Sequence, residues 1–359
     1  MMRIKKFLRL FLPPFIYLLK DKILRKPKEE EAMVITEKEK LYNYTLTLAQ
    51  RQTIKMQDVK KLSEDIPLDW IDLISTGYSE TNYYGDFSTL LSYCDLDFMR
   101  LPPKKFSIQH GYVFDMFSWE KNKLNIINFV WSDAVKKLYL EYGASSNNIF
   151  TIGAPFFYSH PILNKIDIES EKRRLGKNLL AFPLHSTHFM DTNYNPNNFI
   201  NILKGLKKQF DSIRICLYWK DIIRGMDKIY QENGFECVCC GHIFDMNFLR
   251  RQKTLFAIAD ATISNGVGSH IGYSVFMGKG HWLIPDEHKY VDLKWKEGEE
   301  HTKNQTKKNF IDVQNSFLDN ENFIITTEQE SIVDKFWGIS EIKSPSEIRN
   351  LILEAYMRK

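Results

Sequence analysis

The segment Ala261-Thr-Ile-Ser-Asn-Gly-Val-Gly-Ser-His-Ile-Gly-Tyr273 decides the fold, because a strand runs into a glycine-rich turn that opens a helix. In an open parallel sheet such a turn lies at the carboxyl end of its strand, where free backbone amides favour anions and ligands bind. The glycines let the backbone approach a ligand closely, although they also suit a tight structural turn. The candidate donor-binding residues of this turn are Ser264, Asn265, Gly266, Gly268, Ser269 and His270.

Strands and helices alternate regularly around this turn. Short apolar runs predict buried strands, and apolar residues at helical spacing predict helices, one of which opens at Asn195-Pro196. Alternation of this kind produces a parallel sheet with helices on both faces. The predicted strands are 179–182, 213–219, 235–240, 261–264 and 281–284, and the predicted helices are 195–210, 221–233, 248–259 and 271–277.

A less regular series of strands precedes this half of the chain. Apolar runs at 70–74, 106–108, 126–131 and 149–152 predict strands, and Ser132 is the predicted N-cap of a helix that Gly143 closes. A chain of 359 residues exceeds what one core usually supports, so we expect two domains with a cleft between them. The sequence therefore predicts a two-domain α/β protein.

Histidines follow two further strands of the second half. His185, Ser186 and His188 come after the first strand, and His242 comes after strand 235–240. Together with His270 they suit a diphosphate better than an apolar ligand. A zinc site at Cys237, Cys239, Cys240 and His242 is the alternative, but successive strand residues point to opposite faces, which favours buried strand cysteines.

The first half offers a second wall to the cleft. Gln109, His110, Gly111 and Tyr112 follow strand 106–108, and an imidazole there can take a proton from an attacking hydroxyl. A locally hydrogen-bonded turn histidine is the alternative. Tyr84, Glu80 and Asp86 belong to a nearby polar, aromatic loop. Either acid could orient or replace His110 as the base, although solvated loop acids are the simpler interpretation.

Charge is unevenly divided along the chain. The net charge is +4, but residues 1–28 hold nine Lys/Arg and one acid, whereas the remainder holds 40 basic and 44 acidic residues. This balance argues against a protein that coats nucleic acid. The apolar run 10–19 is too short to span a bilayer and contains Pro13 and Pro14, so we expect residues 1–28 to lie in an anionic membrane surface. A helix packed on protein is the alternative. Five cysteines without a disulfide pattern place the body of the protein in the cytoplasm.

The order of these elements resembles the GT-B glycosyltransferases, and among them the bacterial enzymes of capsule and O-antigen (lipopolysaccharide) synthesis. One departure is Gly280-His281 after Lys279, where related chains often have Pro. The resemblance rests on Gln109-His-Gly111, Trp131-Ser132, Ile152-Gly-Ala-Pro155, Gly241-His242, Ser264-Asn-Gly-Val-Gly-Ser-His270, Gly272-Tyr273 and Gly278-Lys279.

The resemblance implies two Rossmann-like domains with parallel sheets facing across a cleft. The second domain would hold a nucleotide-sugar donor, with its phosphates on the 264–270 turn. The first would hold a lipid-linked glycan acceptor, with His110 as base and inversion at the anomeric carbon. No acidic metal pair follows a strand, so no metal or further cofactor is implied. A capping box at Ser344 opens a final helix, which in this fold packs back on the first domain. The implied divisions are a membrane-associating segment 1–28, an acceptor domain 29–165, a donor domain 166–335 and a C-terminal helix 344–359.

Three other functions fit some of these features. A phosphotransferase using a CDP-alcohol or phosphosugar shares the fold and the His-Gly wall. An epimerase of free nucleotide sugars fits less well, because it needs no membrane anchor. A non-catalytic membrane-bound scaffold for polysaccharide assembly would keep the fold with a degenerate cleft.

Overall fold

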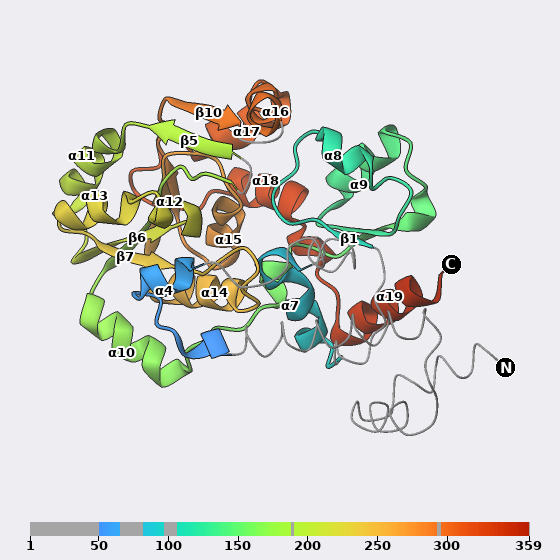
Figure 1. The fold of residues 1–359 in the computed structure, drawn as a ribbon, viewed down its shortest axis with the longest axis horizontal. Helices are drawn as coiled ribbons and strands as arrows, with labels where there is room; N and C mark the ends of the chain where they lie inside the picture. Colours follow the sequence, from blue (N-terminus) through green and yellow to red (C-terminus); the bar gives the residue numbers. More distant parts are fainter. Residues whose placement is uncertain (1–49, 65–81, 97–105, 188–189, 293–295, 359) are drawn as a thin grey trace, which may run out of the picture.

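The computed structural model describes residues 50–64, 82–96, 106–187, 190–292 and 296–358. Two parallel sheets organise them, lying in different parts of the molecule (Figure 1). We call the smaller part the β1–β3 unit, because its sheet has the order β1-β2-β3. Its elements are α7 (Asp86–Tyr93), β1 (Ser107–Ile108), α8 (Ser118–Lys121), β2 (Asn128–Val130), α9 (Asp133–Glu141), β3 (Ile149–Thr151) and the 3-10 helices η2 (Tyr83–Gly85), η4 (Ser146–Asn148) and η5 (Pro155–Tyr158).

The larger part, the β4–β9 unit, is built on a five-stranded parallel sheet of order β7-β6-β4-β8-β9. The chain moves outward from β4 in one direction to β7 and then returns to the other side of β4 at β8. The switch point therefore lies between β4 and β8. Its strands are β4 (Asn178–Phe182), β6 (Ser212–Leu217), β7 (Glu236–Cys239), β8 (Ala261–Ser264) and β9 (His281–Leu283), and its helices include α10 (Lys165–Leu175), α11 (Pro196–Leu206), α12 (Trp219–Ile223), α13 (Met226–Glu232), α14 (Phe248–Ile258) and α15 (His270–Phe276).

Alternation along the strands divides the larger core into two layers. Leu179 and Ala181 of β4 pack in one layer with α11, α12 and α13, whereas Leu180 and Phe182 pack in the other with α14 and α15. The same alternation puts Cys237 and Cys239 in the first layer and Cys240 in the second. The expected opposite placement of these cysteines is confirmed, and all five cysteines of the chain are free.

A two-stranded antiparallel ribbon was not expected from the sequence. Strand β5 (Met190–Tyr194) pairs with β10 (His288–Asp292), and each follows a strand of the large sheet. The strand β5, Met-Asp-Thr-Asn-Tyr, buries the alternate residues Met190 and Thr192, but Thr192 is polar, so the sequence carries little of the apolar alternation that marks a strand. We call this pair the β5–β10 ribbon.

The C-terminal helices connect the two units. Helix α18 (Thr327–Trp337) contributes Val333, Phe336 and Trp337 to a buried cluster that also holds Phe114 and Trp131 of the β1–β3 unit. Helix α19 (Pro345–Met357) buries Ile348, Ile352 and Ala355 against the smaller sheet, and the predicted capping box at Ser344 is confirmed. The preceding helices are α16 (Glu297–Gln305) and α17 (Lys308–Phe317), and η6 (Ile339–Glu341) separates α18 from α19.

Residues 50–64 pack on the larger unit although they precede the smaller one in sequence. Helix α4 (Val59–Ser63) joins the core layer of β6 and β7, and the N–H of Cys239 donates to the carbonyl of Met56 at 2.9 Å. The 3-10 helix η1 (Arg51–Thr53) carries Arg51, whose guanidinium shares buried Asp245 with Arg251 at 3.0 and 2.9 Å. The predicted first-domain range 29–165 thus includes a segment that lies on the second unit.

The helix predicted over 221–233 is wrong in its extent. Helix α12 ends at Ile223, and α13 begins at Met226, because Gly225 takes a φ of +88° between them. Trp219, expected at the end of a strand, is the first residue of α12. Glycine supplies that left-handed conformation at little cost, so the chain turns there.

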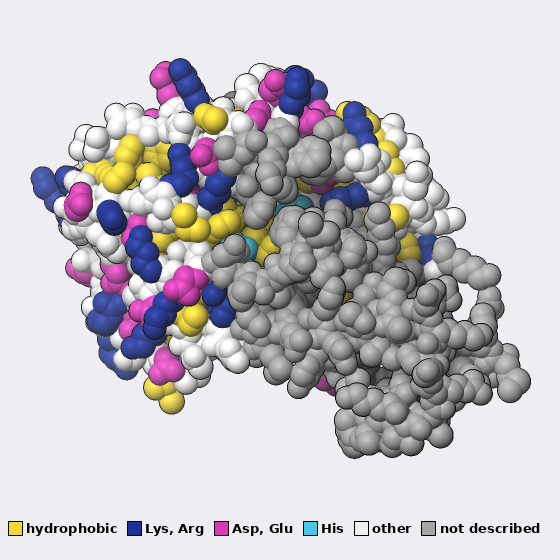
Figure 2. Space-filling model, viewed as in Figure 1, with side chains coloured by type: hydrophobic (Ala, Val, Ile, Leu, Met, Phe, Trp, Pro, Cys, Tyr) yellow, Lys and Arg dark blue, Asp and Glu magenta, His cyan; other side chains and the backbone are white. Residues whose placement is uncertain are grey.

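The predicted strand 70–74 and the basic segment 1–28 lie outside the described residues. Among the residues described, no helix is long and apolar enough to cross a membrane. Basic and acidic side chains are interspersed over the β4–β9 unit on the face shown in Figure 2.

Candidate functional site

Asn265 lies at the switch point, immediately after β8. Its Oδ1 accepts a hydrogen bond from the N–H of Leu184 at 2.5 Å, and its carbonyl accepts one from the N–H of Asp286 at 3.0 Å. The side chain is 1% exposed, yet its Nδ2 has no partner among the described residues. A buried amide nitrogen without an acceptor is costly, so this atom is a candidate for contact with a ligand.

His270 begins α15 and closes the turn. Its ring stacks on Phe182 with centroids 4.6 Å apart and planes 8° from parallel. Burial lowers the pKa of His270 well below its usual value, His281 and His185 lower it further, and a hydrogen bond with the Gly266 carbonyl opposes the shift. The imidazole is therefore uncharged at neutral pH, and its Nε2 has no partner within the described part of the chain.

The remaining residues of the 264–270 turn shape its backbone. A Cβ at Gly266 would overlap the side chain of Leu184, and one at Gly268 would lie 2.5 Å from the His270 ring. The Ser269 carbonyl accepts from Nε1 of Trp337 at 3.0 Å, and Ser264 is fully buried. The turn is thus held tightly from α18 and from the end of β4.

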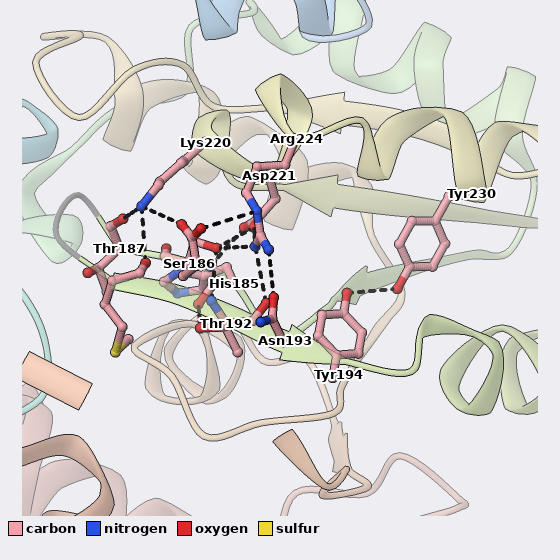
Figure 3. Close-up of polar contacts among 12 residues, drawn as sticks. His185, Ser186, Thr187, Thr192, Asn193, Tyr194, Lys220, Asp221, Arg224 and Tyr230 are labelled. Carbon is pink, nitrogen blue, oxygen red and sulfur yellow. Dashed lines mark hydrogen bonds and ion pairs between the residues drawn. The ribbon is translucent and has the colours of Figure 1, made fainter. Parts of the chain in front are cut away.

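The candidate residues that follow β4 differ in their exposure. His185 is exposed, with its ring 4.9 Å from that of Tyr218. Ser186 is fully buried, and its hydroxyl donates to Asp221 at 2.7 Å and accepts from Arg224 at 2.7 Å (Figure 3). The N–H of Thr192 also donates to this hydroxyl at 3.1 Å. The Ser186 hydroxyl therefore stabilises the β5–β10 ribbon through all three of these bonds. His188 lies outside the described residues.

His242 lies at the end of β7, buried between aromatic rings. Its ring is 4.2 Å from Trp219 and 5.5 Å from Phe244, and its Nδ1 accepts from the N–H of Phe244 at 3.3 Å. In the described ranges, no group of three His, Cys, Asp or Glu residues has the arrangement needed to hold a metal ion.

His110 follows β1 and lies beside an aromatic loop. Its ring centroid is 4.7 Å from Tyr83 and 6.3 Å from Tyr84. Burial, with the positive charge of Lys123, lowers the pKa of His110 to about 3. Gln109 beneath it is buried, and its amide bonds the N–H of Trp131 and the carbonyl of Gly111, each at 2.8 Å. Gln109 thus supports the strand end that carries His110.

Three contacts of Tyr112 and Tyr84 join this wall to the larger unit. The hydroxyl of Tyr112 donates to the carbonyl of Val267 at 3.3 Å, inside the 264–270 turn. The N–H of Tyr84 donates to the carbonyl of Ile243 at 2.6 Å, and the Tyr84 hydroxyl lies 3.3 Å from that of Tyr218. The structure therefore brings the end of β1 against the turn after β8.

Asp86 opens α7 next to this contact and is buried. Burial raises the pKa of its carboxyl well above the usual value, and its Oδ2 has no partner among the residues described here. In its ionised form, Asp86 raises the pKa of Tyr273, which lies in the buried cluster that also holds Trp131 and Trp337. Glu80, the other candidate acid, lies outside the described residues.

No protein-family model matches the chain, and no curated protein sequence does. Among solved structures, UDP-GlcNAc 2-epimerase from Methanocaldococcus jannaschii aligns at 11% identity over 70% of each chain, with a TM-score of 0.37. A UDP co-structure of S. aureus MnaA aligns at 11% identity over 83% of this chain and 91% of that one (TM-score 0.39). Anabaena Alr3699/HepE in complex with UDP-glucose aligns at 12% identity over 75% and 76% (TM-score 0.34). Similarities this loose establish neither a common fold nor a common ligand.

Sequence reasoning missed three residues that hold the site. Asp221 and Arg224 fix the end of β4, and their spacing of three along a helix is a signal that pairs opposite charges. His281 on β9 bonds Ser264 from below the turn at 3.0 Å. The sequence marked His281 only as a departure from the resemblance.

Proposed function

We propose that this chain is a glycosyltransferase with a nucleotide-sugar donor on the β4–β9 unit and an acceptor on the β1–β3 unit. The observation that carries the proposal is the hydrogen bond from Tyr112 to Val267, because it sets the end of β1 against the switch point. Ligands of open parallel sheets bind at such strand ends. A donor seated on the 264–270 turn would therefore have His110 on the opposite wall.

The donor is proposed to satisfy the two unpartnered atoms of the turn. Oxygen atoms of a nucleotide sugar are acceptors for the Asn265 amide, and its hydroxyls can donate to an uncharged His270. The backbone of the turn is already held in place, so its donor groups need not move when charge develops on the leaving diphosphate. This lowers the reorganisation energy of the reaction. Closure of the two units around the substrates would exclude water that hydrolyses the donor.

His110 is the proposed base. Its pKa of about 3 keeps the imidazole uncharged at neutral pH, so a ring nitrogen is free of added charge and can take the acceptor's proton. A group with that pKa is a weak base, but the negative diphosphate of a bound donor would raise the pKa toward the working pH. Asp86 is the second candidate, because burial raises the pKa of its carboxyl and so makes the ionised carboxylate a stronger base than an exposed one.

The acceptor is proposed to be a glycan, lipid-linked and presented at the inner face of the cytoplasmic membrane. The basic, apolar segment 1–28 supports this location through its charge pattern. Deleting residues 1–28 should release the protein from vesicles containing anionic lipid. Unchanged binding by the shortened chain would refute the anchor. Capsule or O-antigen synthesis is the proposed setting.

The test is a screen of the full chain for hydrolysis of, and transfer from, UDP-, GDP-, ADP- and CMP-linked sugars. Release of the nucleotide with the sugar found in a new linkage supports the proposal, and His110→Ala should abolish turnover while leaving the fold intact. Phosphorus retained in the new linkage would identify a phosphotransferase instead. Binding of none of these nucleotides would favour a scaffold.

A further inference from the structure

His281 lies on β9 directly beneath the 264–270 turn. Its side chain is fully buried, and both ring nitrogens have hydroxyl partners. Nδ1 is 2.8 Å from Oγ1 of Thr262, and Nε2 is 3.0 Å from Oγ of Ser264. Both partners belong to β8, the strand that runs into the turn. One imidazole therefore contacts two positions of the neighbouring strand.

The network continues from Thr262 to the far end of the turn. Oγ1 of Thr262 is 2.8 Å from Oγ of Ser274, which donates to the carbonyl of His270 at 2.7 Å. All these side chains are buried, so water does not compete for the bonds. The chain of contacts thus links Ser264 at the start of the turn to His270 at its end.

Counting protons assigns directions along the branch from His270 through Ser274 and Thr262. The His270 carbonyl can only accept, so it takes the single hydroxyl proton of Ser274. The Ser274 oxygen must then accept from Thr262, which leaves the Thr262 oxygen to accept from the imidazole. His281 therefore carries its proton on Nδ1.

The other side of the ring follows from this assignment. Nε2 is left as an acceptor and receives the hydroxyl proton of Ser264. Ser264 Oγ also lies 2.9 Å from the carbonyl of Gly266, to which it donates if Nε2 of His281 carries the proton. With the proton on Nδ1, that carbonyl keeps the ring of His270 as its donor. Each tautomer leaves one pair of oxygens without a proton between them. The Nε2–H form leaves Thr262 and Ser274, 2.8 Å apart, and the Nδ1–H form leaves Ser264 and the Gly266 carbonyl, 2.9 Å apart, so the Nδ1–H form keeps the shorter contact.

We propose that His281, as the Nδ1–H tautomer, is a positioning residue that ties both ends of the 264–270 turn to β9 before any ligand arrives. It acts through Ser264 at one end and through Thr262 and Ser274 at the other. The backbone that carries Asn265 and His270 is then fixed in advance, which lowers the ordering cost of binding. Donor binding by the turn rests on the proposed function. The attachment of the turn to β9 through His281 does not.

The first measurement needs no variant and no ligand. Nitrogen-15 spectra of histidine-labelled full-length protein report which ring nitrogen carries the proton, and the chain has only nine histidines. The His281 signal, assigned by its loss in His281→Asn, should show protonated Nδ1 and unprotonated Nε2 at pH 7. Protonated Nε2 would overturn the proposal.

The second measurement compares two buried threonines after the same substitution. Thr262→Val cuts the network in its middle, and Thr254→Val on α14 also removes a buried hydroxyl with two bonds, to Arg250 at 2.9 Å and from Ile162 at 2.8 Å. Hydrogen exchange of ligand-free protein should rise about tenfold at residues 265–272 in Thr262→Val and stay unchanged there in Thr254→Val. Equal rises in both variants would mean general destabilisation and would overturn the proposal.

Calorimetric titration with UDP, GDP, ADP and CMP then separates this proposal from the proposed function. The nucleotide that binds the wild type should bind Thr262→Val about tenfold more weakly and Thr254→Val with unchanged affinity. Equal affinity for all three proteins would overturn the positioning role. If none of the four binds the wild type, the proposed function fails. The nitrogen-15 spectra and the hydrogen-exchange data, which need no ligand, still test whether His281 holds both ends of the turn.

Discussion

Replacing Asp86 by Asn should stabilise the protein at neutral pH. The carboxyl is buried at the start of α7, and its Oδ2 has no partner in the described part of the chain. In the unfolded chain this group ionises near pH 4, whereas burial raises its pKa in the folded chain. Above pH 4 the folded state therefore binds more protons than the unfolded state, and stability falls as pH rises until the folded pKa is passed. Asparagine keeps the shape without that cost.

The expected gain follows from the cost of the group that is removed. Asparagine leaves a polar group at the same buried position, so the gain comes only from ionisation, and each pKa unit is worth about 1.4 kcal/mol. The free energy of unfolding of Asp86→Asn should thus match the wild type near pH 4 and exceed it by about 1–3 kcal/mol at pH 7. Urea unfolding followed by the fluorescence of the seven tryptophans measures both values.

A matched control uses the exposed acid just after α7. Asp95→Asn makes the same chemical change on an exposed side chain, so it should alter stability by less than about 0.5 kcal/mol at either pH. A loss of stability for Asp86→Asn at pH 7, or a difference that does not depend on pH, would refute the reasoning. If Asp86 also transfers a proton, the more stable variant should lose activity.

Three further changes test the geometry of the site. His110→Gln should flatten the fall in unfolding free energy between pH 6.5 and pH 4, because the unfolded chain protonates first when the folded pKa is about 3; an unchanged slope in urea titrations contradicts this. Gly85→Ala should cost about 1–3 kcal/mol in thermal unfolding, since φ is +78° and the new Cβ would overlap the Met246 backbone; Gly143→Ala, at +93° in open space, should cost less. Trp337→Phe should lose about 1 kcal/mol with the bond to the Ser269 carbonyl and speed amide exchange in the turn, and unchanged exchange would rule out that support.

The local course of the chain was largely predictable from the sequence. The apolar runs and caps predicted every strand of the two parallel sheets that falls in the described residues, because such runs report burial directly. The β5–β10 ribbon was missed, since its strands are polar and β5 depends on the Ser186, Asp221 and Arg224 network (Figure 3). The break at Gly225 needs a backbone angle that composition does not reveal.

The site was predictable in its parts but not in its partners. The 264–270 turn and the His110 wall follow from their positions after strands. The contacts that hold them, from Tyr112 to Val267 and from Trp337 to Ser269, join residues more than 60 positions apart and carry no local signal. The lowered pKa values of His110 and His270 depend on burial that only the packed units create.

The central claim is that a nucleotide sugar binds at the switch point between β4 and β8. Calorimetric titration of the full chain and of Asn265→Ala with UDP, GDP, ADP and CMP tests it most directly. We predict that one of these nucleotides binds the wild type and that Asn265→Ala weakens its binding about tenfold, because the substitution removes the unpartnered Nδ2 along with the Oδ1 that holds Leu184. Binding of none of them, or equal binding by both proteins, would contradict the claim.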